Sequence, residues 1–481
     1  MGGLRTALYS YLVARQAKGQ FLVRIEDTDQ ERSVEGAVEN MLKTLHWAGI
    51  SPEEGVMLQD GIVTEHGSKG PYTQSKRLDI YRKHVDQLLE TGHAYYAFDT
   101  VEEIDAMRTR MQQAGNPAPR YDSSVRMEMR NSLSLPAADT QARLAAGEPY
   151  AIRMKVDSAR VITFQDDIRG KVEFQGAVVD DQVLLKSDGF PTYHLAHVVD
   201  DHLMDIDIVI RGEEWLSSLP KHLLLFEAFG WHAPRYAHVP LLLNQDRSKL
   251  SKRQGDVAVE EYIAKGYLPE AVLNFLAMLG WNAGTTQELF SLNELIEQFS
   301  LERVQKAGAV FDVEKLDWLQ GQWMRRFPLE EFAQRILPIV AAEFPAAAED
   351  DHFEQKAALI QERITFFPEA PSMLGYFYAD PTVEKELLAN PKQKVTPEML
   401  PELLPALLDT LENVAEAQWE EETLQEKLEK LAETMGWKKG QVLWPLRAVL
   451  TGLPFSPGAY EVAAVLGKET TLRRVRNALA L

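Results

Sequence analysis

Apolar positions near the start of the chain follow first a helical and then a strand pattern. Leu4, Leu8, Leu12 and Val13 recur at helical spacing, and Gly19 is expected to end this helix. The apolar run from residue 21 to residue 25 is typical of a buried parallel strand. A polar turn at residues 26–29 and a second helix from about residue 34 to residue 48 follow. Because helix and strand alternate, this part of the chain is predicted to be α/β.

The pattern changes between residues 86 and 179, where short strands, such as residues 150–156, alternate with polar helices. The α/β pattern returns at residues 180–186 and continues through residues 206–211. The simplest interpretation is a Rossmann-like sheet that is interrupted by an inserted α+β domain. From about residue 258 onward, apolar positions repeat almost only at helical spacing, which predicts an all-α C-terminal region.

Composition narrows the class of protein. The chain has 481 residues, which is too long for one compact core and predicts several domains. It contains no cysteine, so disulfides, thiolate zinc sites and a thiol nucleophile are excluded. The net charge of −21 argues against a general nucleic-acid binder, so any such role must use local basic patches. No apolar run is long enough for a membrane span, and the N-terminus does not have the pattern of a secretory signal. We therefore expect a cytoplasmic location.

Two segments have the composition of a phosphate site. Gly2 and Gly3 open a helix, where backbone N–H groups and the helix dipole favour an anion, although two glycines taken alone are more often just a flexible start. The segment 248–253 combines three cationic side chains with two hydroxyls and can clamp a triphosphate. A solvated basic loop is the alternative for this second segment.

Polar residues at strand ends are candidates for recognition of an amino acid. In open α/β sheets ligands bind beyond the carboxyl ends of strands, so Glu26 can accept an α-ammonium group, whereas Asp27 and Asp29 are equally good helix caps. Arg211 ends another strand and matches a carboxylate in a bidentate fork, unless it pairs with Glu213 or Glu214.

A second group of polar residues follows the segment 187–191. Tyr193 and His197 are four residues apart and share one helical face, although a core histidine is the commoner case. The segment 200–202 has the composition of a metal cluster, but capping or ion pairing explains it better.

The order of these motifs resembles that of bacterial-type glutamyl-tRNA synthetases over nearly the whole chain. The stretches that carry the resemblance are residues 2–8, 24–29, 72–75, 184–196, 198–202, 211–216, 249–253, 311–316 and 440–447. The resemblance implies a class I aminoacyl-tRNA synthetase that activates glutamate with ATP and Mg²⁺ and transfers it to the 3′ end of tRNA(Glu). In this family the activation step typically needs bound tRNA.

The resemblance also implies roles for individual residues. The glutamate pocket is formed by Glu26, Tyr193, His197, Arg211 and Trp215, and ATP is contacted by Gly2, Gly3, Glu214, Lys249, Ser251 and Lys252. Lys252, together with Lys249, is expected to be catalytic. His197 departs from relatives that have Asn at this position. Residues 95–98 offer no thiol for the zinc site of some relatives, so no metal site in the protein is expected.

The resemblance further implies a domain order. Residues 1–85 and 180–240 are expected to form the catalytic domain, residues 86–179 the inserted acceptor-binding domain, residues 241–321 a stem-contact region and residues 322–481 a helical anticodon-binding domain. The family normally begins with a strand and an Arg-x-Ala-Pro-Ser-Pro-Thr-Gly segment, whereas this chain enters at the two glycines. Because that segment carries pocket residues, the chain as written is expected to have impaired activity.

Four alternatives to a glutamate–tRNA ligase remain. A tRNA-binding remnant would explain the start of the chain but not the intact 249–253 segment. A glutaminyl enzyme typically has C-terminal β-barrels, and the short paralogue that modifies a tRNA base lacks an anticodon domain. A helical scaffold leaves the α/β half unexplained. The sequence leaves open whether tRNA(Gln) is also charged, and the family expectation is a monomer.

Overall fold

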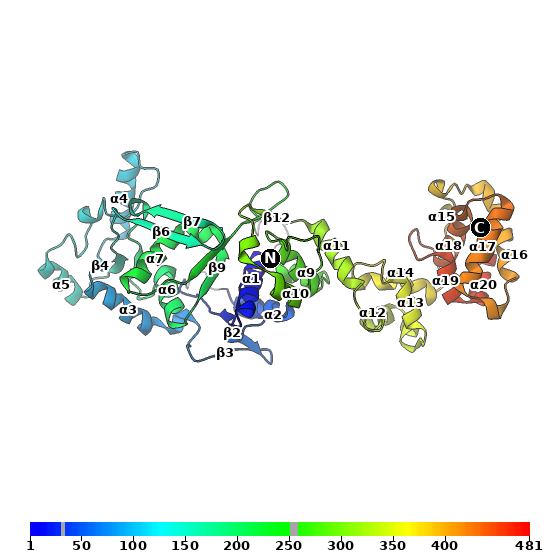
Figure 1. The fold of residues 1–481 in the computed structure, drawn as a ribbon, viewed down its shortest axis with the longest axis horizontal. Helices are drawn as coiled ribbons and strands as arrows, with labels where there is room; N and C mark the ends of the chain where they lie inside the picture. The colour runs from blue at the N-terminus through cyan, green and yellow to red at the C-terminus, as the bar shows by residue number, and fades with distance from the viewer. Residues whose placement is uncertain (30–33, 251–257) are drawn as a thin grey trace. The chain divides into compact units, whose positions relative to one another are not determined.

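The computed structural model describes residues 1–29, 34–250 and 258–481, which form two compact units (Figure 1). Unit 1 comprises residues 1–263 and 272–313, and unit 2 comprises residues 264–271 and 314–481. Among the helices of these described ranges, none combines the length and the apolar character that a bilayer crossing requires.

Unit 1 begins with the predicted helix–strand–helix pattern. Helix α1 (Gly2–Gln16) buries Leu4, Leu8 and Leu12, and it is followed by strand β1 (Leu22–Val23) and helix α2 (Ala37–Trp47). Strand β1 is shorter than the apolar run of residues 21–25 suggests. It is also less buried, since both of its residues are only half-buried. It pairs in parallel with β2 (Glu54–Gln59), which continues into the antiparallel strand β3 (Ile62–His66).

A second parallel pair positions the residues at the end of β9. Strand β9 (Ile208–Gly212) pairs with β10 (Arg235–Val239), and between them lie the short helix η5 (Glu213–Ser218) and helix α7 (Leu219–Ala228). Within the described residues the β1–β2 and β9–β10 pairs belong to separate sheets. A cavity of about 590 Å³ is lined by residues of both β1 and β9. The α/β architecture is thus present, and parallel strands deliver polar residues at their carboxyl ends.

The inserted segment contains two antiparallel sheets. One contains β4 (Ala94–Ala97), β5 (Ala151–Met154) and β8 (Val183–Leu185), and the other is the hairpin of β6 (Val161–Asp166) and β7 (Gly170–Gln175). The expectation that residues 180–186 return to the Rossmann-like sheet is wrong, because β8 pairs antiparallel with β5. An apolar run of this length does not reveal which strand it will pair with. Helices α3 (Leu78–Glu90), α4 (Val101–Gln113), α5 (Ala137–Ala145) and α6 (Tyr193–Leu203) accompany these sheets.

The remainder of unit 1 contains a short parallel pair, β11 (Leu242–Leu243) with β12 (Ala309–Val310), and helices α8 (Val259–Ala264), α9 (Pro269–Met278) and α10 (Leu292–Gln298). Helices α8 and α9 each extend across a boundary between the two units. Helix α10 begins with a capping box, in which Ser291 and Glu294 satisfy each other's backbone N–H groups.

Unit 2 is helical, as the spacing of its apolar residues predicts. Its larger helices are α11 (Val313–Met324), α12 (Leu329–Glu343), α13 (Phe353–Ile360), α16 (Leu400–Glu412), α17 (Glu421–Met435), α18 (Lys439–Thr451), α19 (Ala459–Leu466) and α20 (Lys468–Ala478). Leu424 and Leu428 of α17 and Leu446 of α18 are fully buried in one core. No strand forms between residues 314 and 481, all of which are described.

Candidate functional site

The first part of the candidate site lies just beyond β1, where Arg24 contacts three carboxylates. The Arg24 Nη2 atom lies 2.7 Å from Glu26 Oε1 and 3.0 Å from Asp201 Oδ1, and its Nε atom lies 3.7 Å from Asp200 Oδ2. The Arg24 side chain is only 9% exposed, whereas that of Glu26 is 31% exposed. Because Arg24 is almost enclosed and Glu26 is not, Glu26 is the member of this group that a ligand can reach.

His197 completes this part of the site. Its Nδ1 atom lies 3.6 Å from Glu26 Oε1, and its Nε2 atom lies 3.1 Å from Asp201 Oδ2. Desolvation opposes ionisation of Glu26, but Arg24 and His197 outweigh it and lower the pKa of Glu26 to about 2. Glu26 is therefore an anion at neutral pH, and it lines the cavity of about 590 Å³ together with Arg24, His197 and Asp201.

Asp200 has a structural role beneath this surface. It is fully buried and accepts hydrogen bonds from Arg77 Nε at 2.7 Å, Tyr81 Oη at 2.7 Å and Gln74 Nε2 at 3.0 Å. These three donors satisfy both oxygens of the Asp200 carboxylate. The His202 ring stacks on the Trp231 ring, with the ring centroids 3.8 Å apart. The structure thus engages residues 200–202 in ion pairing and packing. Across the described ranges, no group of three or more His, Asp or Glu side chains is arranged to hold a metal ion.

Arg211 at the end of β9 forms the second part of the site. Its Nη1 atom donates to Tyr193 Oη at 2.8 Å, and its Nε atom donates to His238 Nε2 at 3.0 Å. A longer contact of 3.4 Å joins its Nη2 atom to the Trp215 carbonyl oxygen. Arg211 is only 8% exposed, and within the described residues no carboxylate lies within ion-pair distance of it. A buried guanidinium that only neutral groups satisfy retains a positive charge that the protein does not compensate, so it can bind an anion.

The alternative partners of Arg211 are engaged elsewhere or exposed. Glu213 forms an ion pair with Arg169 and accepts a hydrogen bond from the Leu241 backbone N–H at 3.0 Å. Glu214 is exposed on η5. The interpretation of Arg211 as an ion-pair partner of Glu213 or Glu214 is therefore wrong for the described geometry.

Aromatic rings connect the two parts of the site. The Tyr193 ring lies 5.2 Å from the His197 ring, as the four-residue spacing on α6 predicts, and 5.0 Å from the Trp215 ring. Trp215 is 43% exposed, so its ring lies at the protein surface beside Tyr193. Burial raises the pKa of Tyr193, and its hydroxyl therefore remains a neutral partner for Arg211.

The predicted phosphate-binding residues are placed only in part. Gly2 is the first residue of α1, and a Cβ atom added to it would lie 4.0 Å from Leu242 of β11, the strand that precedes the 248–253 segment. Lys249 is exposed, and its backbone forms an isolated antiparallel β-bridge with that of Leu243. Ser251 and Lys252 lie outside the described residues. Gly3 lines a separate cavity of about 600 Å³, whose other lining residues are mostly apolar but include Thr44, Glu260 and Glu261.

Asp27 contacts the backbone of a segment that is distant in sequence. Its Oδ1 atom accepts a hydrogen bond from the Ser75 backbone N–H at 2.8 Å. Asp27 therefore fastens the turn after β1 to the 72–75 segment.

Sequence reasoning missed the residues that support Arg211. His238 Nδ1 lies 2.6 Å from Asp166 Oδ2, and both side chains are fully buried. His222 lies 3.4 Å from Arg211 through Nδ1 and 3.1 Å from His194 through Nε2. The position of His238, a polar residue within the mostly apolar strand 235–239, could have indicated a functional role. Nothing in the sequence around Asp166 indicates that it contacts His238.

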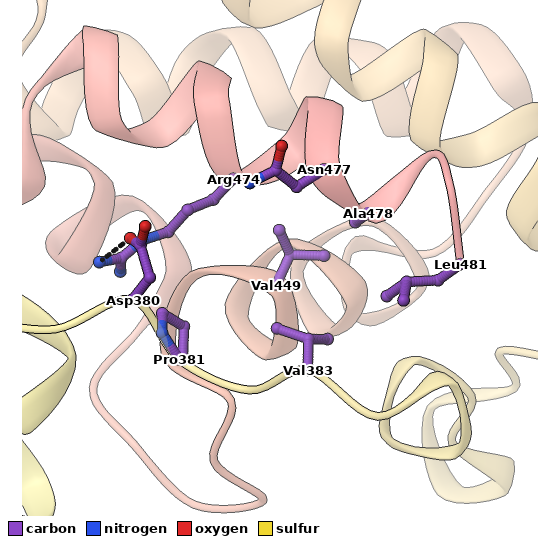
Figure 2. A pocket seen from close by; sticks show the side chains of 8 residues that line it. All are labelled: Asp380, Pro381, Val383, Val449, Arg474, Asn477, Ala478 and Leu481. Atoms are coloured by element: carbon purple, nitrogen blue, oxygen red, sulfur yellow. Dashed lines mark hydrogen bonds and ion pairs between the residues drawn. The ribbon is translucent and has the colours of Figure 1, made fainter.

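Two C-terminal arginines, whose positive charge would suit contacts to RNA phosphates, are held by protein groups. Arg474 donates to the carbonyl oxygens of Leu450 at 2.5 Å and Tyr376 at 2.7 Å, and Figure 2 shows it beside Asp380 in a small pocket of unit 2. Arg476 pairs with Glu412 at 2.7 Å. Arg474 is 6% exposed, so its role is structural.

An α/β unit that carries a carboxylate cluster and a buried arginine is followed in the chain by a helical unit. Residues 1–318 match the family of tRNA synthetases class I (E and Q), catalytic domain, and residues 331–479 match the family described as anticodon binding domain. The chain therefore belongs to the class I tRNA synthetases for E and Q, and the resemblance inferred from the sequence is confirmed.

Curated relatives agree over the full length of the chain. It is 46% identical over 491 residues to the glutamate–tRNA ligase of Prosthecochloris aestuarii and 48% identical over 491 residues to that of Chlorobium chlorochromatii, with 100% of this chain and 95% of each relative covered. A glutamate–tRNA ligase from Elizabethkingia meningosepticum, solved in complex with its amino acid, has a TM-score of 0.86 and 37% identity, and the match covers 100% of this chain and 96% of that one.

Proposed function

We propose that this chain is a glutamate–tRNA ligase, which activates L-glutamate with ATP and transfers it to the 3′ end of tRNA(Glu). The observation that carries the proposal is Arg211, a buried guanidinium without a carboxylate partner among the described residues. A buried, unpaired charge is costly, so a carboxylate ligand that reaches Arg211 gains both charge compensation and a bidentate hydrogen bond.

The charges around Glu26 suit the other end of the same ligand. With all three carboxyl groups of Glu26, Asp200 and Asp201 ionised and His197 neutral, the guanidinium groups of Arg24 and Arg77 leave one negative charge in excess. An α-ammonium group at Glu26 would balance it. Glutamate has an ammonium group at one end and a side-chain carboxylate at the other. The ammonium group would match the negative charge at Glu26, and the carboxylate would match the positive charge of Arg211.

The residues then have these roles. Glu26 and His197 hold the amino-acid backbone end, Arg211 and Tyr193 bind the side-chain carboxylate, and Trp215 borders the pocket. Gly2, Gly3, Glu214, Lys249, Ser251 and Lys252 contact ATP, and Lys252 and Lys249 offset negative charge on the phosphates. In the first step a carboxylate oxygen of glutamate attacks the α-phosphorus, and the bond to pyrophosphate breaks. In the second step the terminal ribose hydroxyl attacks the glutamyl carbonyl carbon and AMP leaves.

Mg²⁺ would reach this site on the ATP phosphates, where it neutralises charge, and no described residue is assigned to hold it. We assign acceptor-end binding to residues 86–179, stem contact to residues 241–321 and anticodon binding to residues 322–481. The protein would act as a monomer in the cytoplasm, and a choice between tRNA(Glu) alone and tRNA(Glu) with tRNA(Gln) would depend on residues of the last segment.

Charging of tRNA(Glu) with labelled glutamate, glutamine or aspartate tests this proposal. Glutamate is expected to be attached, whereas glutamine should react about 10³-fold less efficiently or worse, because it would leave Arg211 without an anion. Preferential attachment of glutamine would support the glutaminyl alternative. Binding of tRNA without attachment of any amino acid would support the remnant instead.

A further inference from the structure

We propose that Asp166 and His238 are positioning residues that hold Arg211 in the orientation needed to bind the glutamate side chain. Asp166 lies at the end of β6, whereas His238 lies in β10 next to β9. The inference rests on the proposed function for the identity of the ligand, but the hydrogen-bond chain stands on its own geometry.

The chain of contacts is continuous and buried. Asp166 Oδ2 lies 2.6 Å from His238 Nδ1, His238 Nε2 lies 3.0 Å from Arg211 Nε, and Arg211 Nη1 lies 2.8 Å from Tyr193 Oη. Asp166 is 1% exposed and His238 is 0% exposed. With water excluded, each group depends on its neighbour in the chain for its hydrogen bonds.

The donors fix which nitrogen of His238 carries the proton. The Nε atom of an arginine is always protonated and can only donate, so His238 Nε2 must present a lone pair to Arg211. The proton of the neutral ring is then on Nδ1, where it points at Asp166 Oδ2. Burial lowers the pKa of His238, which agrees with a neutral ring.

Asp166 is itself oriented by the backbone. Its other oxygen, Oδ1, accepts hydrogen bonds from the N–H groups of Arg169 at 2.8 Å, Ile168 at 3.0 Å and His238 at 3.3 Å. Both oxygens therefore have separate tasks: Oδ1 fastens the β6–β7 turn and Oδ2 selects the His238 tautomer.

This division of tasks makes Asp166→Asn an informative change. The amide oxygen of the variant must take the Oδ1 position, because three N–H groups point there, and the amide NH₂ then faces His238 Nδ1. His238 would have a donor on each side, although a neutral ring can accept at only one nitrogen. Either the ring adopts the Nε2–H tautomer and loses Arg211, or the contact to residue 166 breaks. The proposal expects the first outcome, as occurs when the carboxylate of a catalytic triad is replaced by its amide.

The consequence for Arg211 concerns its geometry. Its guanidinium has one rigid plane, so a rotation that relieves a clash at Nε also moves Nη1 and Nη2. Those two nitrogens are the ones that contact the Tyr193 hydroxyl and the Trp215 carbonyl oxygen. A misplaced plane weakens binding of the glutamate side chain and leaves ATP contacts unchanged.

The first measurement is the ¹⁵N spectrum of the histidine side chains in the whole chain. The His238 signals are assigned as those that vanish in His238→Asn. We expect the Nδ1–H tautomer in the unaltered chain and the Nε2–H tautomer in Asp166→Asn. An Nε2–H tautomer in the unaltered chain, or no change in Asp166→Asn, would overturn the inference.

The second measurement is the KM for glutamate in tRNA charging. Gln at position 238 can place its amide oxygen near the former Nε2 and still accept from Arg211, whereas Asn can reach only the Asp166 side. His238→Asn and Asp166→Asn should therefore raise the glutamate KM about tenfold or more, with less than a threefold rise for His238→Gln and little change in the KM for ATP. Equal effects of the two amides at position 238 would mean that the ring only fills space.

Asp167→Asn is the matched control, because it makes the same chemical change one residue away. Asp167 pairs with the exposed Arg235 at 2.6 Å and does not contact His238 in the described structure. It should leave both the tautomer and the glutamate KM unchanged, and a rise like that of Asp166→Asn would contradict a specific role for Asp166. If the unaltered chain charges no tRNA, the proposed function and the glutamate role fail together, while the spectrum still decides the hydrogen-bond chain.

Discussion

The Nε atom of Arg211 donates a hydrogen bond to Nε2 of His238 across 3.0 Å, although both groups can carry a positive charge. The contact exists because His238 is neutral and its other nitrogen faces Asp166. Arg211 thus receives a neutral acceptor from the protein, and no carboxylate of the described residues neutralises its charge. Arg211 differs in this respect from Arg24, whose positive charge is compensated by three carboxylates.

Arg24 is expected to be essential for the stability of unit 1. Replacement by Met would leave Glu26, Asp200 and Asp201 facing one another without this cation, at a cost of about 3–5 kcal/mol. Thermal unfolding should show a clear fall in Tm for Arg24→Met. The matched control is Arg335→Met, which breaks an exposed pair with Glu331 at 2.7 Å and should cost about 0.5 kcal/mol. Similar decreases in Tm in the two variants would show that the ion pairs of Arg24 do not stabilise unit 1 more than an exposed ion pair does.

His197 is expected to tolerate Asn but not Leu. An Asn amide can still hydrogen-bond one of the two carboxylates that flank the ring, Glu26 and Asp201, so His197→Asn should keep the glutamate KM within about fivefold. His197→Leu would leave both carboxylates without this partner and cost about 1–3 kcal/mol in stability. Charging kinetics and Tm of the two variants check this, and a Leu variant with unaltered KM would remove His197 from the pocket.

Mild acid should destabilise unit 1 through His194. Burial, and secondarily the charge of Lys221, lowers the pKa of His194 to about 4, from an ordinary value near 6.5. A folded-state pKa below the unfolded one gives stability that is complete above about pH 6.5 and is lost as the pH falls through 4. Between pH 7.5 and 5 the unaltered chain should lose about 1–2 kcal/mol more than His194→Asn.

Tm measurements at the two pH values decide this prediction. The exposed His232 provides the control, because His232→Asn should lose as much stability on acidification as the unaltered chain. A fall in Tm that is the same for His194→Asn would assign the acid sensitivity to other groups.

Arg474 should matter for folding of unit 2 rather than for RNA. Replacement by Met removes two buried hydrogen bonds to the carbonyl oxygens of Leu450 and Tyr376, and each orphaned acceptor costs about 1–3 kcal/mol. Arg476→Met breaks only the exposed pair with Glu412 and should cost less than about 1 kcal/mol. Thermal melts combined with tRNA titrations separate the two roles: a stable Arg474→Met with weakened tRNA binding would make Arg474 an RNA contact.

The sequence predicted those features that depend on local pattern. Leu4, Leu8 and Leu12 occupy the buried face of α1, and Leu424 and Leu428 the buried face of α17, because helical spacing places them there whatever the rest of the chain does. The placement of Glu26 and Arg211 at strand ends followed from the same logic, since polar residues directly after an apolar run lie at the carboxyl edge of a sheet.

Features that depend on contacts between distant segments could not be predicted. Asp166 and His238 are 72 residues apart, and neither motif nor spacing links them. The strand β8 was assigned to the wrong sheet for the same reason, because its apolar residues fit either partner. Likewise, the sequence does not reveal that Arg24 contacts Asp200 and Asp201, which lie more than 170 positions further along the chain.

The most direct test of the account is the glutamate KM of Arg211→Lys in charging of tRNA(Glu). Lysine keeps the positive charge but cannot hold His238, Tyr193 and a carboxylate at once in one plane. The account predicts a rise in the glutamate KM of about 30-fold or more, corresponding to about 2 kcal/mol, with the KM for ATP little changed. An Arg211→Lys variant that charges tRNA(Glu) with an unaltered glutamate KM would contradict the claim that Arg211 recognises the substrate.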